Sequence, residues 1–181
     1  MAHYFVVAGE EDFERYKRDY AQALVDKNVL RGVIARSLEI KKSYIEIDEY
    51  DKNERQVFNY GHSFGHAIES LTNYEIPHGI AISVGMDMSN FVSMKKGYIT
   101  SKLRQNSREL FEKIWDGYAD QVKRLDIDTY LVALSKDKKN KGPLLGLILN
   151  KGYGKVFKDF TENDMIFRSW IVEYFANELN Y

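Results

Sequence analysis

The spacing of apolar residues along the chain predicts a succession of helices. Apolar and aromatic side chains recur at three- and four-residue steps from Glu11 to about Asp26 and from about Leu30 to Ile47, which is typical of amphipathic helices. The segment from Gly79 to about Lys96 is apolar nearly all round, which predicts a helix at the buried centre of the domain. Further helices are predicted over Gly61–Thr72, Ser101–Tyr118, Thr129–Ser135 and about Glu162–Leu179, with Thr161 as the N-cap of the last.

A different pattern appears in the last third of the chain. The runs Leu144–Asn150 and Lys155–Phe160 are separated by a Gly-Tyr-Gly sequence, which predicts a strand, a glycine turn and a second strand. The sequence contains no internal repeat and no linker, and 181 residues suit one domain. The predicted fold class is therefore mainly α, with residues 1–181 forming a single helical domain that carries one small β-hairpin.

Composition and charge exclude several classes of function. No run of about 18 apolar residues occurs, which argues against a membrane-spanning helix. The 26 basic and 27 acidic residues give a net charge of −1, which argues against a general nucleic-acid binder. The absence of cysteine excludes disulfides and thiolate metal ligands and favours a reducing, cytoplasmic location.

Histidine is the most informative residue type, because three of the four histidines lie between His62 and His78. His62 and His66 are one helical turn apart, and His78 follows across a short loop. Imidazole is the commonest side-chain metal ligand, so the cluster is a candidate metal site. A histidine pair at this spacing is also common as a structural or exposed feature. Carboxylate ligands could come from Asp48, Glu49 and Glu69, for which helix caps and surface charges are the plainer interpretation.

The sequence around these histidines resembles the metal-site region of the 3-dehydroquinate synthase family of sugar-phosphate cyclases. The resemblance rests on N-Y-G-H-S-F-G-H-A-I-E at Asn59–Glu69 and H-G-x-A-x-x-x-G-M at His78–Met86. It extends to R-S-L-E-I-K at Arg36–Lys41, to Asp-Glu at 48–49 and to D-K-K at Asp137–Lys139. Roughly the whole chain is therefore similar to the helical C-terminal half of that family.

The resemblance implies roles for individual residues. It places two metal ligands at His62 and His78. It makes His66 either a residue that supports the metal ligands from behind or a substrate-contacting residue, and a candidate proton carrier or phosphate ligand. It also implies contacts to the carboxylate, phosphate and hydroxyl groups of the substrate from Lys41, Arg55 and Asn59, and a phosphate contact from Lys138 or its neighbour Lys139.

The implied activity is that of a phosphorus–oxygen lyase dependent on NAD and a divalent metal, Zn²⁺ or Co²⁺ among others. Such an enzyme eliminates phosphate from a phosphorylated sugar acid and closes a carbocycle, as in the conversion of 3-deoxy-arabino-heptulosonate 7-phosphate to 3-dehydroquinate in the shikimate pathway. Lysine and arginine would neutralise the anionic substrate, the metal would polarise hydroxyl oxygens, and NAD would carry the hydride.

Three positions depart from the family pattern. Aligned through Lys41, the family's glutamate metal ligand falls immediately before Met1, and its nearby lysine falls on His3. The glutamate that usually follows His-Gly near the second ligand is Ile80. The resemblance therefore implies either a different sugar-phosphate substrate or a site that is no longer competent.

The family's nucleotide-binding domain has no counterpart in this sequence, which contains no G-x-G-x-x-G. We expect NAD to be bound mainly by an N-terminal α/β domain absent from this chain, and the chain alone to be inactive, whether it is a fragment, a truncated product or one subunit of a split enzyme. A non-catalytic helical domain is an alternative, and its exposed apolar interface would favour homodimers. A metal-dependent alcohol or glycerol dehydrogenase half-enzyme is another.

Overall fold

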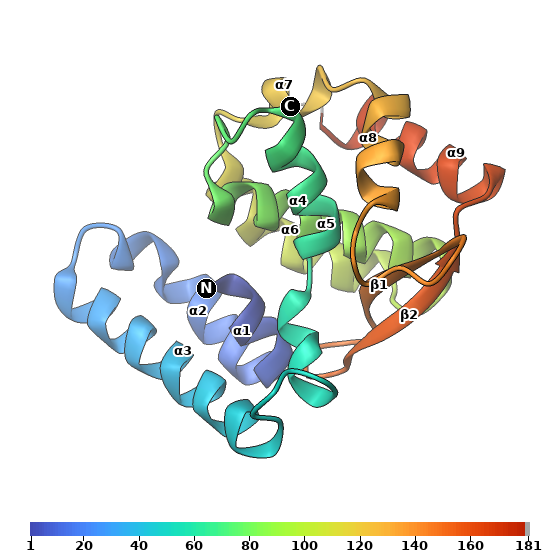
Figure 1. Ribbon diagram of the computed structural model, residues 1–181. Helices are drawn as coiled ribbons and strands as arrows, with labels where there is room; N and C mark the ends of the chain where they lie inside the picture. The colour runs from blue at the N-terminus through green and yellow to red at the C-terminus, as the bar shows by residue number, and fades with distance from the viewer. Residues whose placement is uncertain (180–181) are drawn as a thin grey trace.

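Helices account for most of the computed structural model, which describes residues 1–179 (Figure 1). The helical elements in chain order are α1 (Ala2–Ala8), α2 (Glu10–Ala23), α3 (Lys27–Ile47), the 3₁₀ helix η1 (Glu54–Asn59), α4 (His62–Leu71), α5 (His78–Lys95), α6 (Ser101–Trp115), α7 (Ala119–Lys123), α8 (Ile127–Ser135), α9 (Met165–Glu173) and the π-helical η2 (Tyr174–Glu178). Strands β1 (Leu144–Asn150) and β2 (Val156–Glu162) form an antiparallel hairpin. The predicted mainly helical fold with one hairpin is confirmed.

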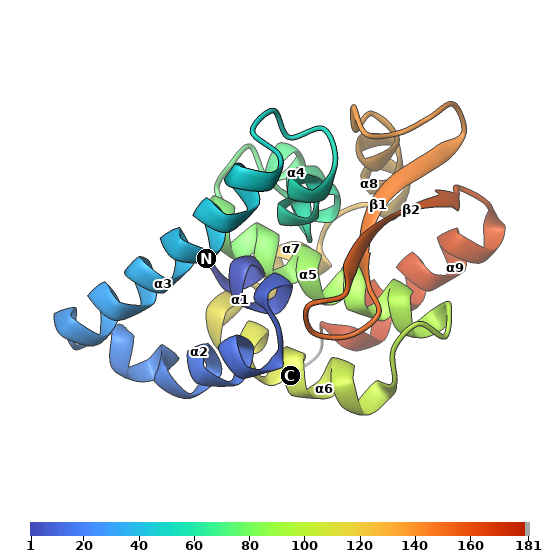
Figure 2. The same cartoon turned by 90° about the horizontal axis from the view of Figure 1, so that it is seen from below.

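Helix α5 is the centre of the fold, as its apolar sequence predicts. Every residue from Ala81 to Ser93 is buried. Helices α4 and α6 and strand β1 pack against it, and α8 packs on the outer side of α4 (Figures 1 and 2). Helices α1, α2 and α3 pack on one another beside this core. None of the helices within residues 1–179 is both long enough and apolar enough to cross a membrane.

The α4–α5 crossing is close because both helices carry glycine at the contact. A Cβ atom added at Gly85 would lie 2.1 Å from the carbonyl oxygen of Gly61 and 2.7 Å from the amide nitrogen of Gly65. Gly61 also has a left-handed backbone, with φ of 80°, immediately before α4 begins. The crossing matters for function because α4 carries two of the clustered histidines and α5 begins with the third.

Substitution of Gly85 by alanine is expected to destabilise the domain by about 1–3 kcal/mol, because the added methyl group overlaps backbone atoms that cannot move aside cheaply. A matched control is Gly32→Ala in α3, where an added Cβ meets nothing within 4 Å. Alanine there should stabilise the helix by about 0.5–1 kcal/mol. Denaturant unfolding of both variants measures the difference, and equal effects at the two sites would contradict the close-crossing argument.

The C-terminal region differs from the sequence-based expectation. Thr161 lies inside β2 and is paired with Leu145, so it is not a helix cap. The helix begins instead at Met165, where the carboxylate of Asp164 accepts a hydrogen bond of 2.8 Å from the amide of Phe167. Lengthening β2 to Glu162 completes its seven pairings with β1, which is why the strand continues through a good capping residue.

Three short elements were not predicted: α1, α7 and η1. Helix α1 has seven residues, too few to show a clear period, and its core contacts fix it. The ring of Phe5 stacks on Tyr16 with 4.3 Å between centroids, and Gly154 donates a hydrogen bond to the carbonyl of Val6. These contacts bring the neighbouring His3 against α4.

Candidate metal and substrate site

The chain fold brings the three clustered histidines together. The ring centroids of His62 and His66 are 5.4 Å apart, those of His62 and His78 are 5.5 Å apart, and those of His66 and His78 are 5.9 Å apart. The first two lie on one face of α4, and Pro77 caps the helix that His78 begins. Residues from two helices thus surround one small volume.

Hydrogen bonds orient two of the three rings. Nδ1 of His62 lies 3.2 Å from the carbonyl oxygen of Tyr60, and Nδ1 of His78 lies 2.9 Å from Oε1 of Glu69. A carbonyl or carboxylate oxygen accepts, so each Nδ1 is the donor, and in the neutral form of each ring Nε2 keeps its lone pair. In metal sites, a carbonyl or carboxylate that accepts a hydrogen bond from Nδ1 in this way fixes the orientation of the ring and leaves Nε2 to bind the metal.

Tyr60, whose carbonyl accepts the hydrogen bond of His62, is held rigidly. The side chain of Tyr60 is fully buried, and its hydroxyl donates a 2.5 Å hydrogen bond to Oδ1 of Asn90. Asn150 also donates to that oxygen at 3.1 Å. Because Tyr60 is fixed on both α5 and β1 through this contact, its carbonyl is a stationary acceptor for the His62 ring.

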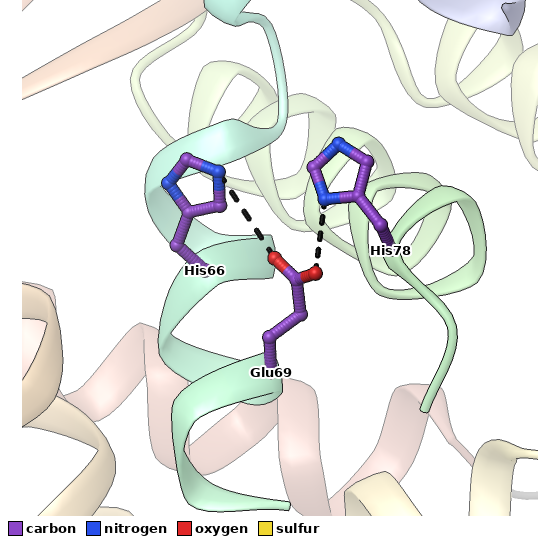
Figure 3. A group of neighbouring side chains, drawn as sticks. All are labelled: His66, Glu69 and His78. Atoms are coloured by element: carbon purple, nitrogen blue, oxygen red, sulfur yellow. Dashed lines mark hydrogen bonds and ion pairs between the residues drawn. The ribbon is translucent and has the colours of Figure 1, made fainter. Parts of the chain in front are cut away.

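Glu69 lies between two of the histidines (Figure 3). It is only 6% exposed, accepts the hydrogen bond of His78, and has its other oxygen 4.0 Å from Nε2 of His66. The interpretation of Glu69 as a cap or surface charge is therefore wrong: α4 points its carboxylate at the histidines. Glu49 remains an exposed residue, and Asp48 is a buried acceptor for the amides of the loop that follows it.

Two donor sets for a metal ion therefore compete. One is His62 with His78, and the other is His66, Glu69 and His78, whose ligand atoms all lie within 4.8 Å of one another. Glu69 offers its second oxygen, Oε2, to the second set while Oε1 keeps the hydrogen bond to His78. The two sets share His78, and both offer donors that suit a divalent cation, the second set adding a carboxylate.

Burial favours the neutral form of His3, His62 and His66. It lowers the pKa of His62 to about 4 and the pKa of His3 to about 2, and it also lowers the pKa of His66. At neutral pH these rings carry no proton that a metal ion would have to displace.

His3 and Ile80, the positions that depart from the family pattern, face the other side of the cluster. The His3 ring lies 5.5 Å from His62, with the planes nearly perpendicular. A mostly apolar cavity of about 360 Å³ is lined by His3 and Ile80 together with His62 and His78. This side offers an apolar wall where the family pattern has charged groups.

A larger cleft of about 1120 Å³ opens on the opposite side of His66 and His78. Its walls include Asn59 from η1, Ser63 from α4, and residues of the loop after α8, among them Lys138 and Lys139. Lys139 forms an ion pair with Asp137, with 2.7 Å between its Nζ and the carboxylate. Lys138 is exposed and, within residues 1–179, has no carboxylate within 4 Å.

Lys41 and Arg55 lie apart from the described walls of this cleft. Arg55 donates a 2.8 Å hydrogen bond to the carbonyl of Glu49 and lies 3.6 Å from Asp51, both in the loop before η1. Lys41 is exposed on α3. The pKa of His3 is lowered mainly by burial, and the nearby positive charge of Lys41 lowers it further. The structure thus brings together His62, His66, His78, Asn59 and Lys138 and leaves these two cations at the edge.

Sequence reasoning named Glu69 as a possible carboxylate ligand but favoured a plainer interpretation, and it missed Gln56 and Lys158 on the cleft wall. Glu69 was signalled only by its place three residues after His66. Lys158 had no local signal, because it enters the cleft from the hairpin, about a hundred residues further along the chain.

Comparison with known proteins identifies relatives of this chain. The model of the family described as 3-dehydroquinate synthase C-terminal matches residues 1–140. The 3-dehydroquinate synthase of Helicobacter pylori (strain P12) is 39% identical over 129 residues, which are 71% of this chain and 37% of that protein. A 3-dehydroquinate synthase of Campylobacter jejuni is 29% identical over 153 residues, which are 83% of this chain and 43% of that protein. The chain thus spans less than half the length of these relatives.

Solved structures of two sugar-phosphate cyclases resemble this chain as well. A 2-deoxy-scyllo-inosose synthase complexed with carbaglucose-6-phosphate, NAD⁺ and Co²⁺ superposes with a TM-score of 0.71 and 27% identity, over 81% of this chain and 41% of that one. A 2-epi-5-epi-valiolone synthase from Streptomyces hygroscopicus with NAD⁺ and Zn²⁺ bound shares the fold, with a TM-score of 0.77 and 17% identity over 98% of this chain and 50% of that one.

Proposed function

Because the chain belongs to the 3-dehydroquinate synthase C-terminal family, we propose that it is the metal- and substrate-binding half of a sugar-phosphate cyclase. The proposed reaction is elimination of phosphate from a sugar phosphate and closure of a carbocycle. The substrate is 3-deoxy-arabino-heptulosonate 7-phosphate or a related compound. The observation that carries the proposal is the convergence of His62, His66 and His78 beside a cleft walled by lysines.

In this proposal His62 and His78 hold a divalent metal, Zn²⁺ or Co²⁺. When bound, such an ion supplies Lewis acidity toward hydroxyl oxygens. Tyr60 and Glu69 hold the two rings with Nε2 free, which supports the assignment. The cofactor NAD is bound mainly by an N-terminal domain outside this chain, and both NAD and a metal accompany the similar 2-deoxy-scyllo-inosose synthase.

We assign the phosphate contact to Lys138 in preference to Lys139. The ammonium of Lys139 is already balanced by Asp137, whereas that of Lys138 is exposed at the cleft with no carboxylate within 4 Å among residues 1–179. His66 stands beside the same cleft, and burial lowers its pKa, which favours the neutral ring that can accept or pass on a proton. Asn59 offers an amide to substrate hydroxyls.

The remaining parts of the proposal concern the whole enzyme. Lys41 and Arg55 contact substrate only at the edge of the cleft, where an N-terminal domain would close over them. The apolar wall at Ile80 favours a sugar phosphate different from the usual family substrate. We place the enzyme in the cytoplasm because the chain lacks cysteine, and we propose a homodimer.

A chimera tests the proposal. This chain replaces the matching C-terminal part of the Helicobacter pylori relative, and phosphate release from 3-deoxy-arabino-heptulosonate 7-phosphate is measured with NAD and Co²⁺ or Zn²⁺. The chimera is expected to release phosphate only when NAD is present, and the chain alone is expected to release none. Turnover by the chain alone would overturn the half-enzyme proposal. A folded chimera that binds NAD and metal but releases no phosphate from this or related sugar phosphates would overturn the proposed activity.

A further inference from the structure

Three polar side chains lie buried behind the histidine cluster, between the end of η1, helix α5 and the end of β1. Tyr60, Asn90 and Asn150 are all 0% exposed. The hydroxyl of Tyr60 donates a 2.5 Å hydrogen bond to Oδ1 of Asn90, and Nδ2 of Asn150 donates to the same oxygen at 3.1 Å. This buried Tyr60–Asn90–Asn150 network joins three segments that are far apart in the chain.

The turn of the hairpin fixes the direction of these hydrogen bonds. The amide of Gly152 donates to Oδ1 of Asn150 at 2.6 Å, so the Nδ2 group of Asn150 faces Asn90. A donor on that side requires Oδ1 of Asn90 to face it, and the same oxygen then accepts from Tyr60. The backbone amide of Asn150 also donates to Oγ of Ser93 at 3.0 Å, which ties the end of β1 to α5 a second time.

Stability alone explains the network poorly. Nδ2 of Asn90 has no hydrogen-bond partner within residues 1–179, and an unpaired buried donor destabilises a fold. The neighbouring residues Phe91 of α5 and Leu149 of β1 are buried and apolar. An apolar side chain at position 90 would avoid the cost of the unpaired donor, so the asparagine indicates a role besides packing.

The network reaches the histidine cluster through the backbone of Tyr60. Its carbonyl accepts the hydrogen bond of Nδ1 of His62, and only Gly61 stands between the two residues. Gly61 is itself enclosed, because an added Cβ would lie 2.7 Å from the carbonyl oxygen of Ile82 on α5. Since Asn90 holds the Tyr60 side chain and α5 encloses Gly61, the direction of the carbonyl is fixed from both sides.

We propose that Asn90 and Asn150 are positioning residues for His62, acting through Tyr60. The inference rests on the proposed function, in which Nε2 of His62 binds a divalent metal. The network keeps the proton of the neutral His62 ring on Nδ1 and leaves Nε2 free for the ion. Asn150 lies beyond residues 1–140, the part of the chain that the family model matches, so the hairpin supports the metal site from outside the matched region.

Nitrogen-15 NMR of the metal-free chain tests the inference, because the shifts of the ring nitrogens report which nitrogen of a neutral histidine carries the proton. The native His62 ring is expected to carry it on Nδ1. Tyr60→Phe removes one hydroxyl and keeps the aromatic ring, and Asn150→Leu removes the donor to Asn90. Each variant is expected to move a measurable share of the His62 proton to Nε2.

Zinc titration of the same variants gives a second measurement. Each single variant is expected to weaken zinc binding about 10-fold, the lower end of the range for groups that orient a metal ligand. The double variant Tyr60→Phe with Asn150→Leu should bind zinc within about 3-fold of the single variants, because both changes break the same path. If Asn150→Leu does not fold, Tyr60→Phe alone decides the question.

Tyr130→Phe is the matched control. Tyr130 is also fully buried, and its hydroxyl donates at 3.2 Å to the carbonyl of Phe64 on α4, so this variant loses a similar hydrogen bond that has no link to a histidine ring. Its free energy of unfolding should fall about as far as that of Tyr60→Phe, while its His62 shifts and zinc affinity stay native. If Tyr60→Phe also lowers only the stability, the positioning role is overturned.

The two measurements separate this inference from the proposed function, because the nitrogen shifts are read without metal. If the variants move the His62 proton but His62→Ala keeps native zinc affinity, the control of the ring by the network stands and the metal assignment fails. If zinc binding requires His62 but the proton stays on Nδ1 in both variants, the metal assignment stands and the positioning role is overturned. A native ring with its proton on Nε2 would also overturn the positioning role.

Discussion

Replacing Asp87 by asparagine is expected to lower the free energy of unfolding by about 3–5 kcal/mol, because it leaves buried cations without their counter-charge. Asp87 lies in the middle of α5 and is fully buried. Its Oδ2 accepts hydrogen bonds of 2.8 Å from Arg104, 2.8 Å from Arg108 and 2.9 Å from the hydroxyl of Tyr174. One carboxylate thus joins α5, α6 and η2.

Glu178 is a second acceptor for both arginines, at 2.9 and 3.0 Å, but it is partly exposed and cannot replace a fully buried charge. Burial also raises the pKa of Tyr174 well above its ordinary value, so that hydroxyl stays a neutral donor. The matched control is Glu46→Gln, which removes an exposed ion pair with Lys42 at 3.6 Å and should change stability by less than about 0.5 kcal/mol. Urea unfolding measures both variants, and a loss below about 1 kcal/mol for Asp87→Asn would contradict this account of the buried network.

Replacing either His62 or His78 by alanine is expected to weaken zinc binding by the isolated chain more than about 100-fold. Changes to groups that only hold a ligand in place already cost about 10–100-fold, so loss of a ligand should cost more. His66→Ala is the matched control because its ring stands within 6 Å of both others but is not assigned as a ligand. Its loss should change the zinc dissociation constant by less than about 10-fold.

Zinc titration with a competing chelator measures these constants, and circular dichroism checks that each variant is folded. The alternative set of His66, Glu69 and His78 predicts the opposite order for the two α4 histidines. Strong weakening by His66→Ala together with a small effect of His62→Ala would therefore move the site to the alternative set.

The sequence pattern predicts the long and uniform elements and misses those that depend on tertiary contacts. Helix α5 is apolar on all sides and is recognisable as the buried centre, and the glycine turn marks the hairpin. Helix α1 is too short to show a period, and Thr161 is a good helix cap by residue type but is paired in β2 with Leu145. In both places contacts with distant segments outweigh local preference.

The candidate site divides in the same way. The spacing of His62, His66 and His78 and the resemblance to a known family are sufficient to indicate the histidine cluster. The burial of Glu69 depends on how closely α4 and α5 cross, which in turn depends on Gly61 and Gly85. No pattern in the sequence around Lys158 indicates that β2 packs against η1 at the cleft wall. The sequence alone therefore could not predict which residues reach the site through the packing of elements that are distant in the chain.

X-ray absorption spectroscopy of the zinc-loaded chain tests the central claim most directly, because it counts the imidazoles bound to the metal. We predict that the native spectrum shows imidazole scattering from His62 and His78, that His62→Ala loses one imidazole, and that His66→Ala loses none. A His62→Ala spectrum identical to that of the native chain would contradict the claim that His62 and His78 share one metal ion.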